Sequence, residues 1–377
     1  MRAVPLRDVV RMSRTTIDPQ KTPDERFEYY SIPAFQAGQR PIVENGANIR
    51  SIKLVVEPDM VLFGKLNPDV PKLWRVSPSE SLRQIASTEF FALVPDRSLL
   101  SPQFLYYLCG TATVLRSAIG LGQGSTPSRQ RVDLNGFLDI RIPLPPLEEQ
   151  RRIARILSTI QDDERISDAQ VAALRDLRRS MVEAALAGQD DVELRSLMER
   201  PQYGFTASAS VGRPVKFLRI TDIQESGIDW SVVPSCDPAP PPDSRYELAD
   251  GDLVVARIGA TTGKAWLMRN PPLSIFASYL IRIRAADGVD PRFLAAYFES
   301  KTYWEQIDAA KGDRLKGGVN IENLNSLRVP FISLAEQRKL GEALDAVSTS
   351  LAAARKRRVA VSTVFGAALT SLLDGAA

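Results

Sequence analysis

The chain has 377 residues, 44% of them hydrophobic, and a formal net charge of +3, so two or three domains are expected and nucleic-acid binding would depend on local basic patches. It contains no histidine, which excludes histidine-based triads, imidazole metal ligands and histidine general bases. Two cysteines, Cys109 and Cys236, exclude a disulfide framework and suit the cytoplasm, and no apolar run has the length of a membrane span or a signal peptide.

Residues 1–146 are predicted to form a mixed α/β module of short strands and turns. Ser101-Pro102 is typical of a helix start, and the apolar residues that follow have helical spacing. The segment from Gly120 to Arg131 is polar and rich in glycine and carries two arginines, so a loop is expected there. Short β-branched or aromatic runs bounded by turn residues predict strands at 53–56, 60–63 and 89–94.

Residues 147–189 and 334–377 are predicted to form two long helices. Apolar residues recur in both at alternating steps of four and three, although three of the ten positions in the first seam are polar or charged. Helices of about 40 residues are about 60 Å long at 1.5 Å per residue. They would bury such seams most easily against one another, and a whole module separates them along the chain, so an antiparallel coiled coil is expected. The alternative is two unrelated surface helices.

Residues 190–333 are predicted to form a second mixed α/β module. Strands are expected within 217–223 and 251–259, and a helix is expected to run from Pro291 through Trp304. The segment 235–243 is rich in proline and should be irregular. The segment 311–318 combines basic residues with glycines and should be a loop like that at 120–131.

The two halves of the chain are an internal repeat. The segment 142–153, IPLPPLEEQRRI, is answered by 329–340, VPFISLAEQRKL; Gln150 and Gln337 are 187 residues apart, since 337 minus 150 is 187. Between the matching anchors the halves are dissimilar, which predicts two modules of one fold with diverged working surfaces. Other anchors pair Leu6-Arg7 with Leu194-Arg195, 59–62 with 252–255, 102–105 with 291–294, and 132–142 with 319–329.

Two segments look like motifs of enzymes. Gly259 to Lys264 resembles a P-loop, but it has one residue too few between the glycines and no Ser or Thr after the lysine. Asn270-Pro271-Pro272-Leu273 resembles the tetrapeptide of adenine methyltransferases, but it lacks the aromatic residue that would stack on a flipped base. Ordinary turns are the expected reading of both, and the chain is interpreted as neither a nucleotide hydrolase nor a methyltransferase.

The duplicated segment at 142–153, which leads into a long helix and follows a glycine-rich loop, resembles the specificity subunit of type I restriction-modification systems. A turn of Asp133-Leu134-Asn135, with 320–323 in the second half, and the strand and turn at 251–264 are also similar to that family. The resemblance covers essentially the whole chain. Two departures are the replacement of the proline-rich form by 331–335 and the absence of a Gly-Lys turn after Lys65-Leu66-Asn67.

The resemblance implies an α/β (α+β) protein with two similar target recognition domains, at 1–146 and 190–333, separated by two antiparallel coiled-coil spacer helices. It implies a non-catalytic, cofactor-free and metal-free subunit that reads a bipartite, asymmetric site in double-stranded DNA. Its partners would be DNA methyltransferase subunits, two of them, and in some systems a restriction-translocase subunit. The alternative function is a coiled-coil scaffold of a related phage-defence complex that does not itself read DNA.

Basic and polar residues in the recurring loops are the candidates for DNA contacts, because Lys and Arg bind phosphates while Arg, Gln, Asn and Thr read base edges. The alternative for each residue is an ordinary solvated position in a loop. The candidates are Lys65, Asn67, Gln123, Ser125, Thr126, Arg129 and Gln130 in the first module, and Arg257, Thr261, Thr262, Lys264, Lys311, Arg314 and Lys316 in the second.

The Glu-Gln-Arg triplet at the start of each long helix is the candidate partner interface. It consists of Glu149, Gln150 and Arg151 and of Glu336, Gln337 and Arg338. Because an acidic residue in the first turn is favoured by the helix dipole, helix capping is an equally good interpretation.

Overall fold

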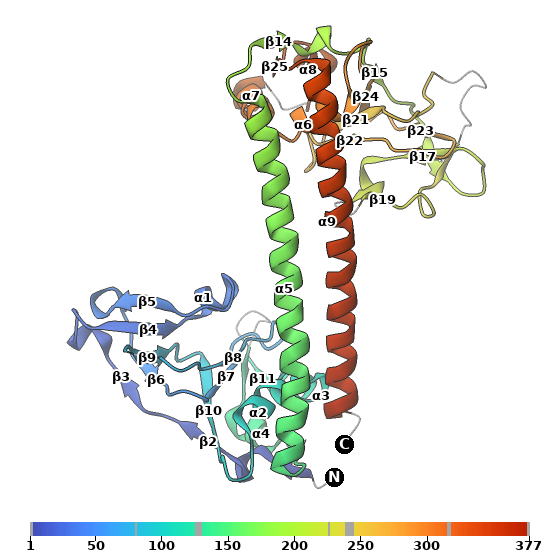
Figure 1. The fold of residues 1–377 in the computed structure, drawn as a ribbon. Coiled ribbons are helices and arrows are strands. Elements are labelled where there is room, and N and C mark those ends of the chain that lie inside the picture. The colour runs from blue at the N-terminus through green and yellow to red at the C-terminus, as the bar shows by residue number, and fades with distance from the viewer. Residues whose placement is uncertain are drawn as a thin grey trace. The chain divides into compact units, whose positions relative to one another are not determined.

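The computed structural model describes residues 3–79, 81–124, 130–224, 227–237, 245–314 and 318–374. The chain forms two compact units: unit 1 is Met1–Ile166 with Arg358–Ala377, and unit 2 is Ser167–Arg357. Each unit thus combines one mixed α/β module with one end of each long helix (Figure 1). The division runs through both helices, so the boundaries at 146/147, 189/190 and 333/334 stay a prediction.

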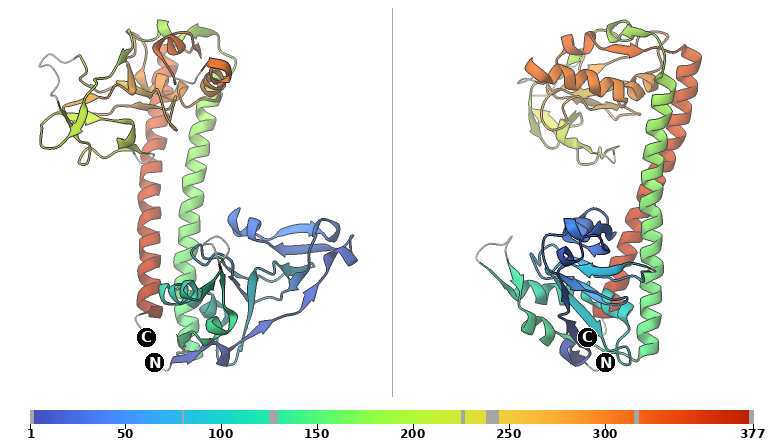
Figure 2. Two further views of the ribbon diagram at one scale, coloured as in Figure 1. Left: turned by 180° about the vertical axis from the view of Figure 1, so that it is seen from behind. Right: turned by 90° about the vertical axis from the view of Figure 1, so that its left-hand side faces the viewer.

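The two predicted long helices are α5 (Leu147–Leu186) and α9 (Leu334–Leu369), and α9 is followed by a π-helical turn, Thr370–Asp374. Within each unit their segments lie side by side and run in opposite directions (Figure 2). In unit 1 Leu157 shares a core with Phe365 and Leu373, and in unit 2 Val171 packs with Leu351 and Ala354. The apolar seams therefore face one another, as the heptad spacing predicts.

The central sheet of unit 1 has the order β2-β10-β7-β8, and helices cover one of its faces. Its other face packs on a five-stranded sheet, β3-β6-β9-β4-β5, and on α1. The first and last strands of the module, β1 and β13, pair with one another. The bounds are β1 Ala3–Pro5, β2 Val10–Ser13, β3 Thr16–Ile17, β4 Arg26–Tyr30, α1 Ile32–Gln36, β5 Ile42–Asn45, β6 Lys53–Val55, β7 Val61–Gly64, β8 Leu73–Arg75, β9 Arg83–Ala86, β10 Phe90–Pro95, α2 Pro102–Cys109, α3 Ala112–Gly120, β11 Gly122–Gln123, β12 Arg131–Val132, α4 Leu134–Asp139 and β13 Arg141–Pro143.

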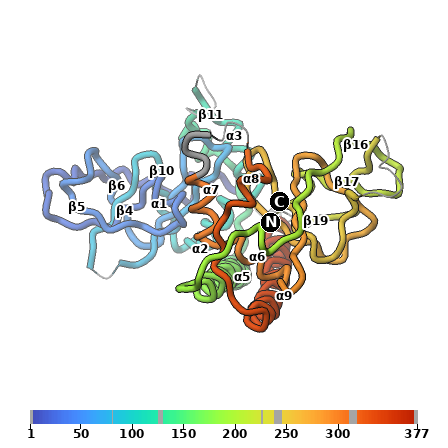
Figure 3. The backbone as a smooth tube through the Cα atoms, turned by 90° about the horizontal axis from the view of Figure 1, so that it is seen from above, coloured from blue at the N-terminus to red at the C-terminus, as the bar shows by residue number. Residues whose placement is uncertain are grey.

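Unit 2 repeats this plan with the sheet β15-β24-β21-β22, and β14 pairs with β25. Three separate strand pairs lie on the side of the module away from α7 (Figure 3), where unit 1 has its five-stranded sheet. The bounds are β14 Asp191–Glu193, β15 Gln202–Tyr203, β16 Ser208–Ser210, β17 Lys216–Leu218, β18 Ile223–Gln224, β19 Gly227–Ile228, β20 Ser235–Asp237, β21 Leu253–Ala256, β22 Ala265–Leu267, β23 Ser274–Phe276, β24 Leu280–Ile283, α6 Pro291–Tyr297, α7 Lys301–Arg314, α8 Ile321–Asn325 and β25 Arg328–Pro330.

Backbone pairing fixes the register of the repeat and corrects one anchor. The N–H of Val132 donates to the carbonyl of Lys65 at 2.9 Å, and the N–H of Val319 donates to the carbonyl of Arg257 at 2.8 Å. Lys65 therefore corresponds to Arg257, and Val61 to Leu253, so the sequence alignment of Asp59 with Asp252 is wrong by one residue. The burial pattern agrees, since Val61 and Leu253 both face the helix-covered core. A one-residue slip would turn every side chain of the strand to the other face.

Two expectations for the second module are also corrected. The helix that begins at Pro291 ends at Tyr297, and Trp304 lies in a separate helix, α7. Residues 311–314 are the end of α7 and not a loop. Gly312 costs the helix only about 1 kcal/mol relative to alanine, which does not stop a helix already formed over ten residues.

Candidate nucleic-acid interface and helix junctions

The structure brings together two of the predicted contact segments of unit 1. The N–H of Asn67 donates to the carbonyl of Gln130 at 2.9 Å, and Gln123 opposes Arg131 in the β11–β12 pair. Asn67 adopts a φ of +52°, a left-handed conformation that asparagine tolerates better than most residues. Lys65, Asn67, Gln123 and Gln130 thus belong to one cluster, which we call the loop base of unit 1. Ser125, Thr126 and Arg129 lie outside the described residues.

Lys72 holds the backbone next to this loop base, and this role was not predicted from the sequence. Its Nζ donates to the carbonyls of Val70 at 2.7 Å and Leu66 at 3.1 Å, and the residue is only 6% exposed. Burial lowers the pKa of its ammonium group below the ordinary value. No local signal separates this lysine from a solvated one, because its acceptors are backbone carbonyls.

An ion pair joins Arg131 to Glu89 at the edge of the loop base. Its two hydrogen bonds measure 3.2 Å from Nε and 3.0 Å from Nη2, and they form a bidentate pair. The carbonyl of Glu89 also accepts from the N–H of Lys65 at 2.9 Å. Glu89 therefore ties the strand end that carries Lys65 to the strand β12 that follows the loop.

The loop base of unit 2 is organised around Arg257. Its guanidinium lies over the ring of Tyr203, with Cζ 4.6 Å from the centroid, and Nη1 donates to the carbonyl of Ser278 at 3.3 Å. Its Nε is buried and has no hydrogen-bond partner among the described residues. Much of this side chain is thus engaged inside the module, while its predicted contact with DNA stays a prediction.

Gly318 occupies the position that corresponds to Arg131. It has a φ of +89°, and a Cβ atom there would overlap the carbonyl oxygen of Arg257. The backbone of unit 2 therefore approaches more closely than a side chain would permit. The two modules share a backbone hydrogen bond at this place and differ in the side chains around it.

The turn 259–264, which resembles a P-loop, is packed against α7. The carbonyl of Gly263 accepts from the hydroxyl of Tyr303 at 2.6 Å. Thr262 donates to the carbonyl of Gly259 at 2.7 Å, and the hydroxyl of Thr261 is buried without a hydrogen-bond partner among the described residues. Lys264 is exposed. The turn therefore presents one cation at its end and keeps both threonines partly buried.

Three further candidates cannot be placed by their side chains. Lys311 and Arg314 belong to α7 by their backbone, but their side chains lie outside the described part of the structure, as does Lys316 altogether.

The two glutamines of the helix-start triplets are fully buried. Gln150 Oε1 accepts from the N–H of Ser101, and its Nε2 donates to the carbonyls of Leu99 and Pro145, all at 2.8 Å. Gln337 accepts from the N–H of Asp290 at 2.9 Å and donates to the carbonyl of Ile332 at 2.8 Å. Both residues are 0% exposed, so their side chains offer no surface to a partner, which corrects that assignment. They fasten the start of each long helix to the start of α2 or α6.

The charged members of the triplets reach the surface. Glu336 accepts hydrogen bonds from the N–H and the hydroxyl of Ser333, which hold the pKa of its carboxyl below the ordinary value. Glu149 pairs with Arg152 at 2.7 Å. Arg151 and Arg338 are exposed. Capping thus accounts for Glu336, and partner contact stays a prediction for the exposed charges.

Across the described residues no cluster of acidic, cysteine or histidine side chains is arranged to hold a metal ion. In the same part of the chain, none of the helices has both the length and the apolarity needed to cross a bilayer.

Comparisons with known proteins find similarity to one class of DNA-recognition subunit. Residues 71–171 match the sequence model of the type I restriction modification DNA specificity domain. The chain is 22% identical over 341 residues to the type I restriction enzyme MjaVIII specificity subunit of Methanocaldococcus jannaschii, covering 81% of this chain and 78% of that protein. Residues 71–171 thus resemble a DNA specificity domain, and most of the chain is similar to a type I specificity subunit.

Two solved structures share the fold. A type I restriction-modification system S subunit from M. genitalium superposes with a TM-score of 0.67 at 12% identity, over 99% of this chain and 96% of the other. A chain from a structure of the assembly and conformational transition of a type I R-M system gives a TM-score of 0.55 at 21% identity, over 98% and 97%. At these identities the likeness concerns the fold, and it agrees with the family resemblance of the sequence.

Proposed function

We propose that this protein is the non-catalytic DNA-recognition subunit of a type I restriction-modification complex. The observation that carries the proposal is the pair of modules with one backbone plan and different loop bases, in a chain whose residues 71–171 match a DNA specificity domain. Each module reads one half of a bipartite site, and the halves differ because the loops differ. The domains are 1–146 and 190–333, with spacer helices at 147–189 and 334–377.

The loop bases carry the DNA contacts in this proposal. In the first module Lys65, Asn67, Gln123 and Gln130 lie together, and the segment 125–129 connects to them. In the second module Lys264 is an exposed cation at the end of the turn 259–264, and Arg257 fixes the backbone of the loop base. Exposed lysines and arginines supply the salt-dependent affinity, and the polar side chains select the bases.

The partners in this proposal are DNA methyltransferase subunits, which dock on the spacer helices near Glu149, Arg151, Glu336 and Arg338. The four residues are charged and at least partly exposed, and they lie within the first five residues of α5 and α9. A restriction subunit would join through the methyltransferase subunits where the system contains one.

A module exchange tests the proposal. Residues 1–146 are replaced by the corresponding module of a related protein, and methylated adenines are mapped across a genome that expresses the complex. One half of the methylated site should change and the other should persist. The matched control exchanges residues 190–333, which should change the opposite half. A change in both halves after either exchange would contradict the assignment of one reader to each half.

The alternative, a scaffold that does not read DNA, is separated by duplex binding. The proposed subunit should bind random duplex with an affinity that falls steeply with salt, alone or with its methyltransferase partner. Absence of binding under both conditions would favour the scaffold.

A further inference from the structure

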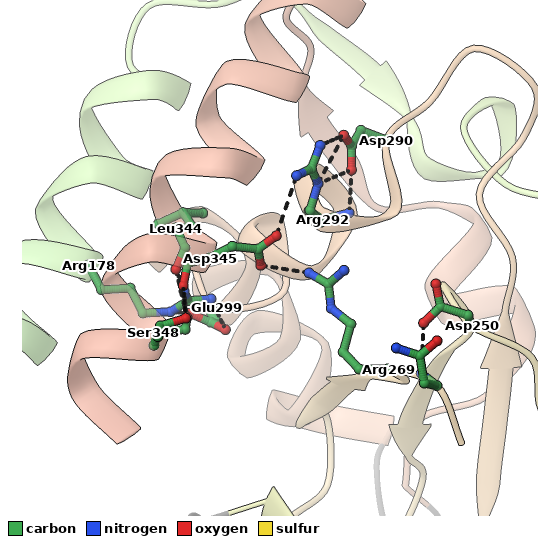
Figure 4. Close-up of polar contacts among 11 residues, drawn as sticks. Arg178, Asp250, Arg269, Asp290, Arg292, Glu299, Leu344, Asp345 and Ser348 are labelled. Atoms are coloured by element: carbon green, nitrogen blue, oxygen red, sulfur yellow. Dashed lines mark hydrogen bonds and ion pairs between the residues drawn. The ribbon is translucent and has the colours of Figure 1, made fainter. Parts of the chain in front are cut away.

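In unit 2 a half-buried arginine of the helix seam, Arg178, joins the recognition module to both long helices. The side chain of Arg178 in α5 donates to the two carboxylate oxygens of Glu299, each at 2.8 Å. Its remaining nitrogen donates to Ser348 Oγ at 2.7 Å and to the carbonyl of Leu344 at 3.2 Å, both in α9 (Figure 4). Arg178 is one of the polar positions that interrupt the apolar seam, and this contact explains why an arginine is there.

Asp345 in α9 forms a second connection of the same kind. One carboxylate oxygen accepts from Arg269 at 2.6 Å and the other from Arg292 at 3.4 Å. Arg292 itself is held by both oxygens of Asp290, with Nη2 at 2.6 Å (Figure 4). Arg269 follows β22 and Arg292 lies in α6, so two separate parts of the module converge on one side chain of the helix. We call the contacts of Arg178 and Asp345 the two clamps.

The helix backbone is shaped to fit the second clamp. Gly341 of α9 lies one turn before Asp345, and a Cβ atom there would come within 2.8 Å of Arg292 Cζ. Glycine inside a helix is unfavourable relative to alanine, so its presence needs a reason. The reason here is room for the guanidinium of Arg292 against the helix.

Unit 1 has apolar or uncharged residues at every corresponding position. In the internal repeat Phe365 corresponds to Arg178, Gly110 to Glu299 and Ser158 to Asp345. Ala154 likewise corresponds to Gly341, and Gln103 to Arg292. Where unit 2 has the Arg178 clamp, unit 1 has a hollow of about 210 Å³ bordered by Phe365, Gly110 and Tyr107. Both modules pack on their helix ends through apolar cores, and only in the second do these positions add ion pairs to that packing.

We infer that Arg178 and Asp345 are positioning residues for DNA recognition, because they fix the angle of the second module on its helix ends. This inference rests on the proposed function, in which the helices separate two half-sites. With the clamps intact, the second reader meets its half-site at one spacing. Without them, the module tilts on its apolar contacts and accepts neighbouring spacings as well.

Methylation of duplexes with altered spacers tests this inference. The complex of the full chain with its methyltransferase partner is given its mapped site, and matched sites whose spacer is one base pair longer or shorter. Asp345→Asn and Arg178→Met should reduce the preference for the natural spacer on the order of tenfold, since small misplacements have effects of this size or more. Asp176→Asn, which breaks the exposed Arg179–Asp176 pair on the same helix, should leave the preference unchanged.

The outcomes separate a failure of the proposed function from a failure of the positioning role. If the wild-type complex methylates no two-part site, the proposed function is wrong. If it does, and folded variants keep the wild-type spacer preference, the positioning role is wrong. Should Arg178→Met fail to fold by circular dichroism, the isosteric Glu299→Gln is used in its place. The spacer preference is the ratio of methylation on the natural spacer to that on an altered spacer. If added salt lowers this ratio in the wild type as the substitutions do, the result supports a clamp based on charge.

Discussion

The loop bases of the two modules share one backbone hydrogen bond and surround it with different side chains. In both, a backbone N–H after the loop donates to the carbonyl of the residue after the central strand, Lys65 or Arg257. Around that bond unit 1 places the Arg131–Glu89 ion pair, whereas unit 2 places a glycine and stacks Arg257 on Tyr203. The two modules therefore share this backbone pairing and differ in the side chains that surround it.

The buried glutamines are the strictest shared feature, and removing them should have the largest effect. Gln150→Leu leaves the N–H of Ser101 and two carbonyls without their partner, and Gln337→Leu leaves one N–H and one carbonyl. Each buried unsatisfied group costs about 1–3 kcal/mol, so we expect Gln150→Leu to destabilise unit 1 by about 3 kcal/mol or more, and Gln337→Leu to destabilise unit 2 somewhat less.

Hydrogen exchange resolved by unit measures both losses separately, which a single melting temperature of a two-unit chain would not. Exposed Arg151→Leu is the control and should change stability by less than about 0.5 kcal/mol. Equal, small effects of all three substitutions would show that the glutamines do not fasten the helices.

The glycine at the loop base of unit 2 should give the next largest effect. Gly318→Ala combines a positive φ with an overlap against the carbonyl of Arg257, so we expect a loss of about 2 kcal/mol in unit 2. Denaturant unfolding followed by the fluorescence of the tryptophans in unit 2 measures it. Gly212→Ala is the matched control, because that glycine also has a positive φ but has open space around it. A loss no greater than that of the control would mean that the close approach is unimportant.

The corresponding position in unit 1 should tolerate change best. Arg131→Ala removes an ion pair whose side chains are 53% and 28% exposed, and such pairs contribute less than about 1 kcal/mol. The loss should shrink further as salt is raised, whereas that of Gly318→Ala should not. Denaturation at low and high ionic strength checks both statements, and an Arg131→Ala effect that is large and independent of salt would remove the contrast between the modules.

Much of the fold could be predicted from the sequence because it depends on local patterns. The repeat, the two long helices and the central strands follow from spacing and from turn residues such as Ser101-Pro102. The buried roles of Lys72, Gln150 and Gln337 could not, because their partners are backbone groups that become neighbours only after folding. The alignment of Asp59 with Asp252 failed for a related reason: identity at a turn suggested one register, and hydrogen bonding between strands fixed another.

The candidate contact residues were predicted from the composition of the loops. The structure shows which of their side chains are accessible, and it does not test which of them bind DNA. Lys65, Asn67 and Gln130 meet because the segments 65–67 and 130–132 pair, which loop composition alone does not reveal. Arg257 and Thr261 looked like free polar side chains, yet both are largely occupied or buried within the module. Their surroundings are built from β15 and α7, which lie far from them in the chain.

Gly341 has a consequence for how related sequences can vary. Its lack of a side chain is useful only while residue 292 is an arginine, and in the first half of the same chain alanine stands at 154 beside a glutamine at 103. The chain therefore contains two compatible combinations of one pair of positions. Changing either partner alone leaves a collision or an empty space, so a module 190–333 moved into this chain should keep an arginine at position 292, or residue 341 should be exchanged with it.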